Sequence, residues 1–252
     1  MTDPEDFINA LELAPLPDDL PQRTSRGLQN AEVEVDKDQA FINNKSLVSF
    51  AAGISPKYRQ DVLDSTLLAS LAADRKFPDN SNPRAWYDFY VKVLSSIGWT
   101  TDRNENKAYT SAEAEFDVNQ AVIEIMTAIA GGPGVQAILI AKTLTALKGL
   151  ADEDGKIRLF EKRAKGLDTS NFQVGVATES AEAVSLNVSN FYFENIQGSR
   201  KVIFFRWGGD RAALNYQFFQ GTLNTQVYAD SRPLVKQKIA AYRTTLIDEL
   251  DL

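Results

Sequence analysis

The chain of 252 residues contains no histidine and no cysteine. Histidine is the commonest general base in enzymes, and cysteine supplies thiolate nucleophiles and many metal ligands. Catalysis would therefore depend on carboxylates, lysine or tyrosine. Glu179 and Glu182 lie close together, but they fall in a predicted hairpin loop, where acids are usually just solvated. The sequence thus leans towards a non-enzymatic protein with no catalytic residue, although carboxylate or lysine chemistry remains open.

Residues 150–161 imitate a calcium-binding loop. Asp152 and Asp154 occupy its third and fifth positions, Gly155 the sixth and Glu161 the twelfth. The first position, which should supply an oxygen ligand, is Leu150. Calcium requires six to eight oxygens, so we interpret the segment as a polar turn after a helix and expect no metal site.

The residue pattern with the most distinctive chemistry is an uncharged helical hairpin. Between Glu124 and Lys142 there is no charged residue, and Gly131-Gly132-Pro133-Gly134 interrupts the run. Helices that are apolar nearly all round are either buried or placed in lipid. The stretch is too short and too broken for a permanent span, which needs about 20 apolar residues. Two interpretations remain, namely the central hairpin of a core, or a hairpin that is buried in solution and inserts into lipid later. The candidate lipid-contacting residues are Ile125, Ile129, Gly131, Gly132, Pro133, Gly134, Val135, Ile138 and Leu139.

Four helices are predicted in the first two thirds of the chain, and the last two of them form this hairpin. Ser55-Pro56 and Asn82-Pro83 each combine an N-cap with proline at the first helical position. Gly98 should end the second helix. A third helix is expected to begin at Asp117, and a fourth to follow Gly134 and end at Gly149. Residues 41–166 are therefore predicted to be mainly helical.

Residues 167–226 are predicted to form a four-stranded antiparallel meander. Apolar side chains alternate in residues 172–176, 184–193 and 214–218, and residues 202–207 form an apolar run between turn signals. A closing helix over 227–252, capped by Ser231, should cover the sheet. The predicted fold class is α+β, with a helical N-terminal half, and residues 41–252 form a single domain.

Aromatic rings crowd both sides of these strands. One interpretation is a sheet covered by helices on both faces; the other leaves one face open to lipid or an apolar ligand. The rings belong to Phe191, Tyr192, Phe193, Phe204, Phe205, Trp207, Tyr216, Phe218 and Phe219.

Residues 1–40 are predicted to form an acidic, flexible arm. They contain ten acidic and three basic residues, which accounts for the whole net charge of −7. A neutral body with an acidic arm repels phosphate backbones, so nucleic-acid binding is not expected. Alternatively, Phe7, Leu11 and Leu13 engage a protein partner. The N-terminus lacks the pattern of a cleaved Sec signal peptide, so we expect a soluble protein that is cytoplasmic in its producer or exported by another route.

Several segments together are similar to the Erwinia virulence factor (Evf) family of bacterial virulence proteins. They are Trp86–Tyr90, Val93–Trp99, Asp154–Phe160, Asn171–Gly175 and Phe191–Phe193. The resemblance covers roughly residues 50–250 and implies a factor that acts on a host and associates with membrane through a fatty acyl chain. Acylation in that family needs a cysteine, which is absent here. Only a non-covalently bound fatty acid is therefore compatible with this chain.

Two functional hypotheses follow. The first is a non-enzymatic, secreted or injected, virulence or toxin-like protein that binds lipid or a host membrane. The second is a protein-interaction module, such as a cargo, adaptor or assembly subunit, that docks through its acidic arm.

Overall fold

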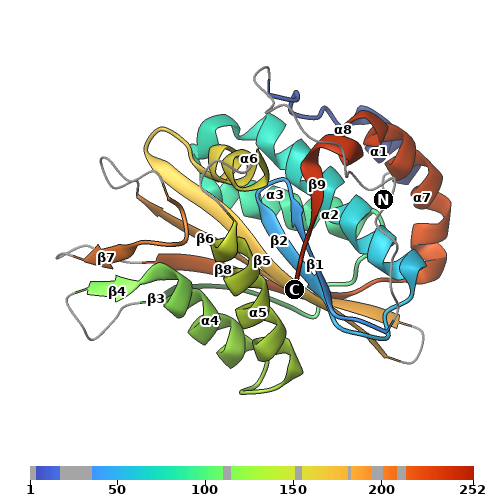
Figure 1. Ribbon diagram of the computed structural model, residues 1–252. Helices are drawn as coiled ribbons and strands as arrows, with labels where there is room; N and C mark the ends of the chain where they lie inside the picture. The colour runs from blue at the N-terminus through green and yellow to red at the C-terminus, as the bar shows by residue number, and fades with distance from the viewer. Residues whose placement is uncertain are drawn as a thin grey trace.

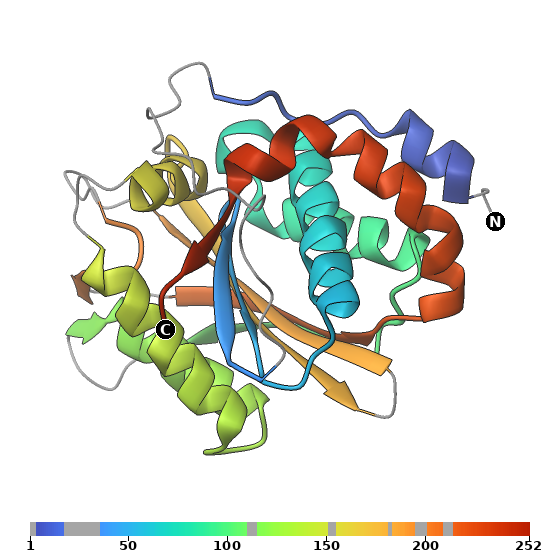
Figure 2. The same cartoon turned by 45° about the vertical axis from the view of Figure 1, so that its right-hand side comes forward.

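A seven-stranded mixed sheet crosses the middle of the molecule, with helices on both faces (Figures 1 and 2). The computed structural model describes residues 4–17, 36–109, 115–150, 155–180, 183–194, 201–208 and 214–252. The strand order is β3-β8-β6-β5-β2-β1-β9, and β4 and β7 form a separate two-stranded sheet. The strands are β1 (Gln39–Asn43), β2 (Ser46–Phe50), β3 (Arg103–Tyr109), β4 (Glu115–Asp117), β5 (Thr169–Ser180), β6 (Ala183–Glu194), β7 (Arg206–Gly208), β8 (Leu214–Thr222) and β9 (Ile247–Leu250).

The helices form two layers that bury different sides of the sheet. One hydrophobic core joins α1, α2, α3, α7 and α8 to one face, and a second core joins α4, α5 and α6 to the other. The helices are α1 (Pro4–Ala10), α2 (Pro56–Lys76), α3 (Pro83–Ser96), α4 (Val118–Ile129), α5 (Val135–Gly149), α6 (Gly155–Ala164), α7 (Thr225–Lys238) and α8 (Ala240–Leu246), with a short 3₁₀ turn, η1 (Pro78–Asn80).

The helix starts predicted around residues 56 and 83 are confirmed. The backbone N–H of Tyr58 donates to Ser55 Oγ, and that of Ala85 donates to Asn82 Oδ1, so both caps satisfy amides that the first helical turn leaves unpaired. Gly98 follows α3 with a φ of +115°, and a Cβ there would lie 3.1 Å from the backbone nitrogen of Tyr228. Only glycine fits this helix end comfortably.

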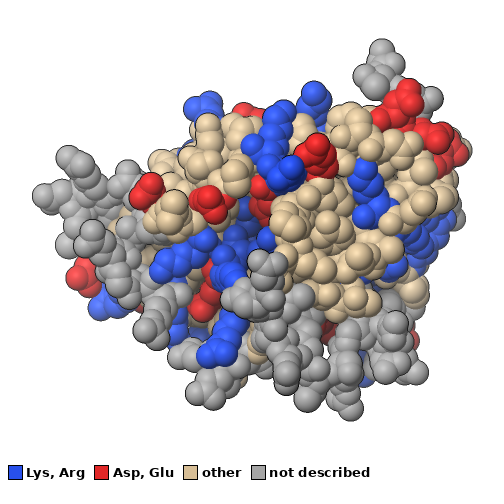
Figure 3. Space-filling model, turned by 90° about the horizontal axis from the view of Figure 1, so that it is seen from above, with Lys and Arg blue, Asp and Glu red and all other residues tan. Residues whose placement is uncertain are grey.

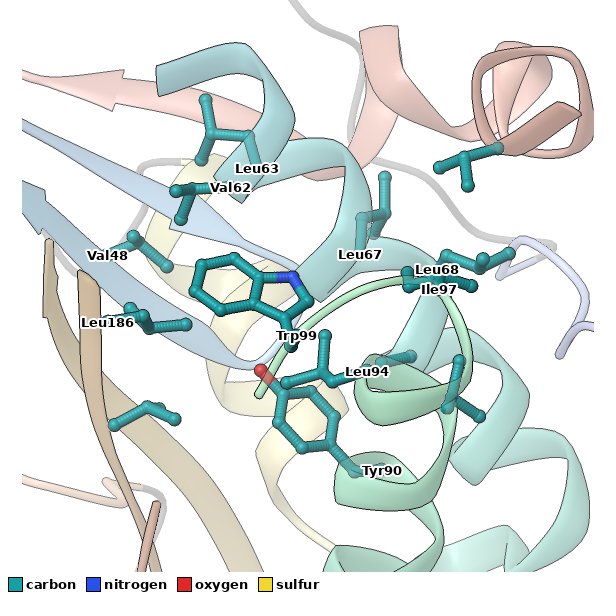
Figure 4. Close-up of a cluster of buried hydrophobic side chains, with 14 of the residues drawn as sticks. Val48, Val62, Leu63, Leu67, Leu68, Tyr90, Leu94, Ile97, Trp99 and Leu186 are labelled. Atoms are coloured by element: carbon teal, nitrogen blue, oxygen red, sulfur yellow. The ribbon is translucent and has the colours of Figure 1, made fainter. Parts of the chain in front are cut away.

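Trp99 packs in the core between α2, α3 and the sheet, among leucine and valine side chains from all three (Figure 4). Its ring packs edge-on against Phe219, and its indole N–H donates to Ser65 Oγ at 3.1 Å. This buried hydrogen bond satisfies the one polar atom of the ring.

The four-stranded meander predicted from the sequence is wrong. Three of its strands exist as β5, β6 and β8, but β6 pairs directly with β8. The apolar run of residues 202–207 leaves the sheet, and only its end, in β7, pairs with β4. Val202 and Ile203 are adjacent and both buried in the second core. A strand would point such neighbours to opposite faces, so here burial does not indicate a strand.

The helical N-terminal half is also wrong, because strands are interspersed among the helices. The hairpin of β1 and β2 enters the centre of the sheet, where β2 pairs in parallel with β5. All ten residues of these two strands are buried. Strands covered on both faces lose the polar–apolar alternation by which sequence patterns identify a strand.

The closing helix differs from its prediction at both ends. Helix α7 begins earlier, where Asn224 caps it, and it includes Pro233. The chain leaves helical geometry at Ile239, forms α8, and then continues as β9, which pairs with β1. The apolar spacing of the residues in β9 also suits a helix, but they form a strand because they pair with β1, which is distant in sequence.

Residues 4–17, assigned by sequence to the acidic arm, pack along the body. Ile8 is fully buried, and Phe7 and Leu13 pack against the first core. The backbone of Ala14 donates to Leu71 O at 3.1 Å, and Lys238 Nζ donates to Asn9 O at 2.8 Å. Docking of an external partner by Phe7, Leu11 and Leu13 would have to displace these contacts. Residues 18–35 of the proposed arm lie outside the described part of the chain.

Candidate functional site: the α4–α5 hairpin

The structure brings all nine candidate residues together in one hairpin formed by α4 and α5. Two consecutive glycines at the turn adopt left-handed conformations, with φ of +86° at Gly131 and +122° at Gly132. These values are strained for residues with a side chain, which explains the glycine-rich link. In Figures 1 and 2 the turn lies at the lower extremity of the molecule.

The inner side of the hairpin is part of the core. Ile125 is 5% exposed and Leu139 is fully buried, in the cluster that includes Val174 and Val176 of β5. A buried side-chain hydrogen bond between Ser49 Oγ and Thr143 Oγ1, at 2.8 Å, joins this layer to the sheet. This side of the hairpin is therefore buried against the sheet.

The tip presents apolar side chains to solvent. Val135 is 65% exposed and Ile138 is 58% exposed. They lie three residues apart in the first turn of α5, so they share one side of the helix. Five large hydrophobic residues are exposed in the described part of the chain; two of them are these neighbours, and the others are Leu167, Val227 and Leu252.

A pair of this size corresponds to a modest affinity for an apolar surface. Burying a whole valine or isoleucine side chain contributes about 1.5–3 kcal/mol, so the exposed parts of two contribute about 2–4 kcal/mol. That corresponds to roughly 30- to 700-fold partitioning, enough for reversible surface contact and well short of stable insertion. Within the described ranges, no helix has the length and apolar character that crossing a bilayer requires.

The opposite face of the sheet contains a buried row of amides that the sequence did not reveal. Gln173, Asn190 and Gln217 face one another across β5, β6 and β8, beneath α3. Burial raises the pKa of the neighbouring Tyr90, so its hydroxyl stays protonated at neutral pH. A neutral amide row beside a protonated tyrosine offers hydrogen bonds but no nucleophile or base. In the sequence, each of these amides looks like an ordinary surface residue of a strand. Only the pairing of the three strands shows that they lie side by side.

Buried ion pairs on the same side of the sheet were likewise not predicted from the sequence. Lys45 Nζ lies 2.7 Å from Asp74 Oδ1, and Arg232 makes a bidentate contact of 2.7 and 2.8 Å with Asp61. Burial lowers the pKa of Lys45, against the opposing effect of Asp74. Each pair joins α2 to a distant element, which is a structural role.

The remaining candidates do not assemble into a catalytic or metal site among the residues described. Glu179 Oε2 accepts a hydrogen bond of 2.8 Å from the backbone of Ser55 at the start of α2, whereas Glu182 lies outside the described residues. In the calcium-like loop, Asp152 and Asp154 are also outside them, and Gly155 begins helix α6. Among the described residues, no group of three or more acidic side chains is placed so that it could bind a metal ion.

Comparison with known proteins gives weak structural likenesses and no sequence match. No protein-family model matches the chain, and no curated protein does. A solved delta-endotoxin is similar over 71% of this chain and 83% of its own, with a TM-score of 0.42 and 9% identity.

The structure of the Evf virulence factor is similar over 79% of this chain and 81% of its own, with a TM-score of 0.34 and 14% identity. The activated Cyt2Ba monomer from Bacillus thuringiensis subsp. israelensis is similar over 72% and 95%, with a TM-score of 0.34 and 9% identity. The Evf structure, to whose family the sequence bears a resemblance, is thus among these weak matches. At these values, the likeness is weak and concerns the fold alone.

Proposed function

We propose that the protein is a non-enzymatic, toxin-like virulence factor, secreted or injected, whose α4–α5 hairpin binds lipid at the surface of a host membrane. The single observation that supports this most is the pair of exposed side chains, Val135 and Ile138, at the tip of an uncharged hairpin. Exposed neighbouring apolar residues at an extremity of a fold are typical of a contact surface for another apolar phase.

In the proposed first step, the tip enters the boundary between headgroups and acyl chains. The first charged residues on either side of the tip are Glu124 and Lys142, each more than one helical turn away along its helix. Shallow contact therefore desolvates no ionised side chain of the hairpin, which would oppose binding.

A deeper step would transfer the rest of the hairpin from the core to hydrocarbon. The polar links that oppose it among the described contacts are Ser49 with Thr143, Asn187 Nδ2 to Gln136 Oε1 at 3.1 Å, Tyr109 Oη to Glu124 Oε2 at 2.8 Å, and Lys142 with Asp38 at 3.3 Å. The buried side chains of the hairpin are mostly apolar, and hydrocarbon replaces their contacts at little cost.

Flotation of the full chain with liposomes, at neutral and at acid pH, tests the proposal. The double variant Val135→Asp/Ile138→Asp should lose most of its binding, because two carboxylates cannot enter the acyl region without a large desolvation cost. Leu167→Asp/Val227→Asp is the matched control, since it adds the same charge at exposed apolar residues of other elements. Absence of binding by the native chain at both pH values, or equal losses in the two variants, would contradict the proposal.

Bound fatty acid is a separate part of the same proposal. A pocket of about 370 Å³ lies between α1, α2 and α3, where Leu11 and Phe89 contribute apolar surface. Its volume is within the usual range for small-molecule sites. Native mass spectrometry of the purified protein should show an added mass of one fatty acid that denaturation removes, and its absence after incubation with palmitate would contradict this part.

A further inference from the structure

A pocket of about 470 Å³ lies at the end of the fold opposite the hairpin tip. Three segments distant in sequence line it, namely residues 14–17, η1 with its flanks, and the last turn of α6 with Lys165. Figure 3 looks onto this end of the molecule, where lysine and arginine side chains gather towards the middle of the face. The volume is within the range of small-molecule sites.

The wall of the pocket is a strained turn. Asp79 and Asn80 both have positive φ, of +58° and +52°, which non-glycine residues adopt at an energetic cost. Asn80 is 5% exposed, and its Nδ2 donates to the backbone oxygens of Arg163 and Ala164 at 3.3 and 3.1 Å. These bonds fix the turn against the end of α6.

A glycine makes this close approach possible. A Cβ at Gly166 would lie 1.9 Å from the backbone oxygen of Asp79. Since no side chain fits there, the turn and the basic end of α6 are held in one fixed arrangement. Strain held by surrounding contacts is typical of positions that shape a binding site.

Basic side chains outnumber acids in the lining. Arg75, Lys162, Arg163 and Lys165 line it together with two acids, Asp74 and Asp79, and Arg75 also pairs with Glu12 at 3.0 Å. The Asp74 carboxylate is already engaged by Lys45, by Trp86 Nε1 at 2.8 Å and by Asn44 Nδ2 at 2.9 Å. Its charge is therefore offset inside the protein. In the Arg163 guanidinium, Nη2 donates to Pro15 O at 3.5 Å, whereas the buried Nε has no hydrogen-bond partner in the described part of the chain.

Basic residues at the end of a helix also have a simpler role. Lysine and arginine in a last turn stabilise a helix by opposing its dipole, and Lys162 and Arg163 occupy that turn in α6. This explains their charge, but it explains neither the strained turn at Asp79 and Asn80 nor the close approach at Gly166. It also leaves the pocket beside them without a role.

We propose that this pocket binds a small molecule that carries a phosphate group. Arginine and lysine are the side chains that phosphate prefers, and the Arg163 guanidinium can donate two parallel hydrogen bonds to phosphate oxygens. The organic part of the ligand lies against the apolar side of the pocket, formed by Pro15, Leu16, Phe77 and Pro78. The same phosphate chemistry is offered by soluble phosphate esters and by a lipid headgroup.

Isothermal titration calorimetry of the full chain with inorganic phosphate, pyrophosphate and glycerol phosphate tests the proposal, at constant ionic strength set with sodium chloride. A parallel arm uses vesicles of phosphatidic acid and of phosphatidylcholine. The variant Arg163→Gln/Lys165→Gln should weaken binding about tenfold or more, because it removes two charge-assisted contacts. The matched control is Lys57→Gln/Lys92→Gln, which removes two exposed lysines from α2 and α3 and should change the dissociation constant less than about twofold.

If the native chain and the control bind the soluble phosphates but the double variant does not, the ligand is a soluble phosphate ester. If the native chain and the control bind only the phosphatidic acid vesicles, and the double variant does not, the pocket binds a lipid headgroup. Absence of binding in both arms, or equal weakening in variant and control, overturns the proposal. Lys165→Gln alone is the second variant, in case the double change alters the fold. The Val135→Asp/Ile138→Asp variant should retain phosphate binding, so failure of the membrane proposal and failure of this one are distinguishable.

Discussion

The carboxyl group of Asp64 gives a prediction whose magnitude follows from its surroundings. Asp64 lies in α2, with its side chain fully buried. Gln60 Nε2 donates to Oδ1 at 2.8 Å, and Arg243 Nε of α8 lies 2.9 Å from Oδ1 as an ion pair, without the angle of a hydrogen bond. Burial raises the pKa of Asp64 to about 6 from 3.8; Arg243, Gln60 and Lys236 lower it, and Asp61 adds a smaller increase.

A carboxyl group whose pKa is higher in the folded state stabilises the fold when it is protonated. The contribution is complete below the unfolded pKa and is lost as the pH rises through about 6. A shift of about two pKa units corresponds to roughly 3 kcal/mol in total, of which about 2 kcal/mol is lost between about pH 4.5 and 7.5. Around this residue, acidification therefore strengthens the fold and does not loosen it.

Urea unfolding of the native chain and of Asp64→Asn, from about pH 4.5 to 7.5, measures this contribution. Asparagine keeps the side-chain volume and an oxygen that accepts the hydrogen bond from Gln60, but its amide does not titrate. The variant should gain about 2 kcal/mol relative to the native chain across this range. A difference that is constant with pH, or that changes in the opposite direction, would refute the reasoning that burial outweighs Arg243.

Two further predictions concern backbone contact and burial. Gly166→Ala should lower the free energy of unfolding by at least about 3 kcal/mol, because its Cβ would collide with the Asp79 carbonyl and break the contacts of Asn80. Gly149→Ala, where a Cβ meets nothing within 4 Å, is its control; similar unfolding midpoints for the two variants would show that the close approach is wrong. Ile8→Ala should cost about 2–5 kcal/mol, because Ile8 is fully buried, whereas Ile138→Ala at the exposed tip should cost less than about 0.5 kcal/mol. Thermal unfolding of the two isoleucine variants measures these losses of stability. Equally small losses in both variants would mean that α1 does not pack stably on the body.

The candidate hairpin was accessible from the sequence because its signals are local. A run without charge, two apolar helical patterns and a glycine-rich link are all visible without knowing what the segment packs against. Exposure is different. Val135 and Leu139 look equally apolar in the sequence, yet one is 65% exposed and the other fully buried. The direction of the sheet relative to α5 decides which of the two side chains is exposed.

The phosphate pocket, in contrast, has no sequence signal. Its residues come from three segments, and Lys162 and Arg163 alone look like ordinary basic residues at a helix end. The decisive contact joins Gly166 to Asp79, almost ninety positions apart. A glycine needed because another backbone passes close to it cannot be distinguished in sequence from one needed for a turn.

The sequence by itself determined the α+β class, the caps of α2 and α3, the hairpin and the absence of histidine and cysteine chemistry. These depend on composition and on neighbours within a few residues, which local hydrogen bonding and side-chain periodicity dictate. Only the tertiary structure decided that β1, β2 and β9 complete a seven-stranded sheet, that residues 202–205 leave it, and that residues 4–17 lie on the body. The physical reason is that strand pairing and burial are satisfied by partners far away in the chain, and short apolar segments suit several such partners equally well until the whole fold selects one.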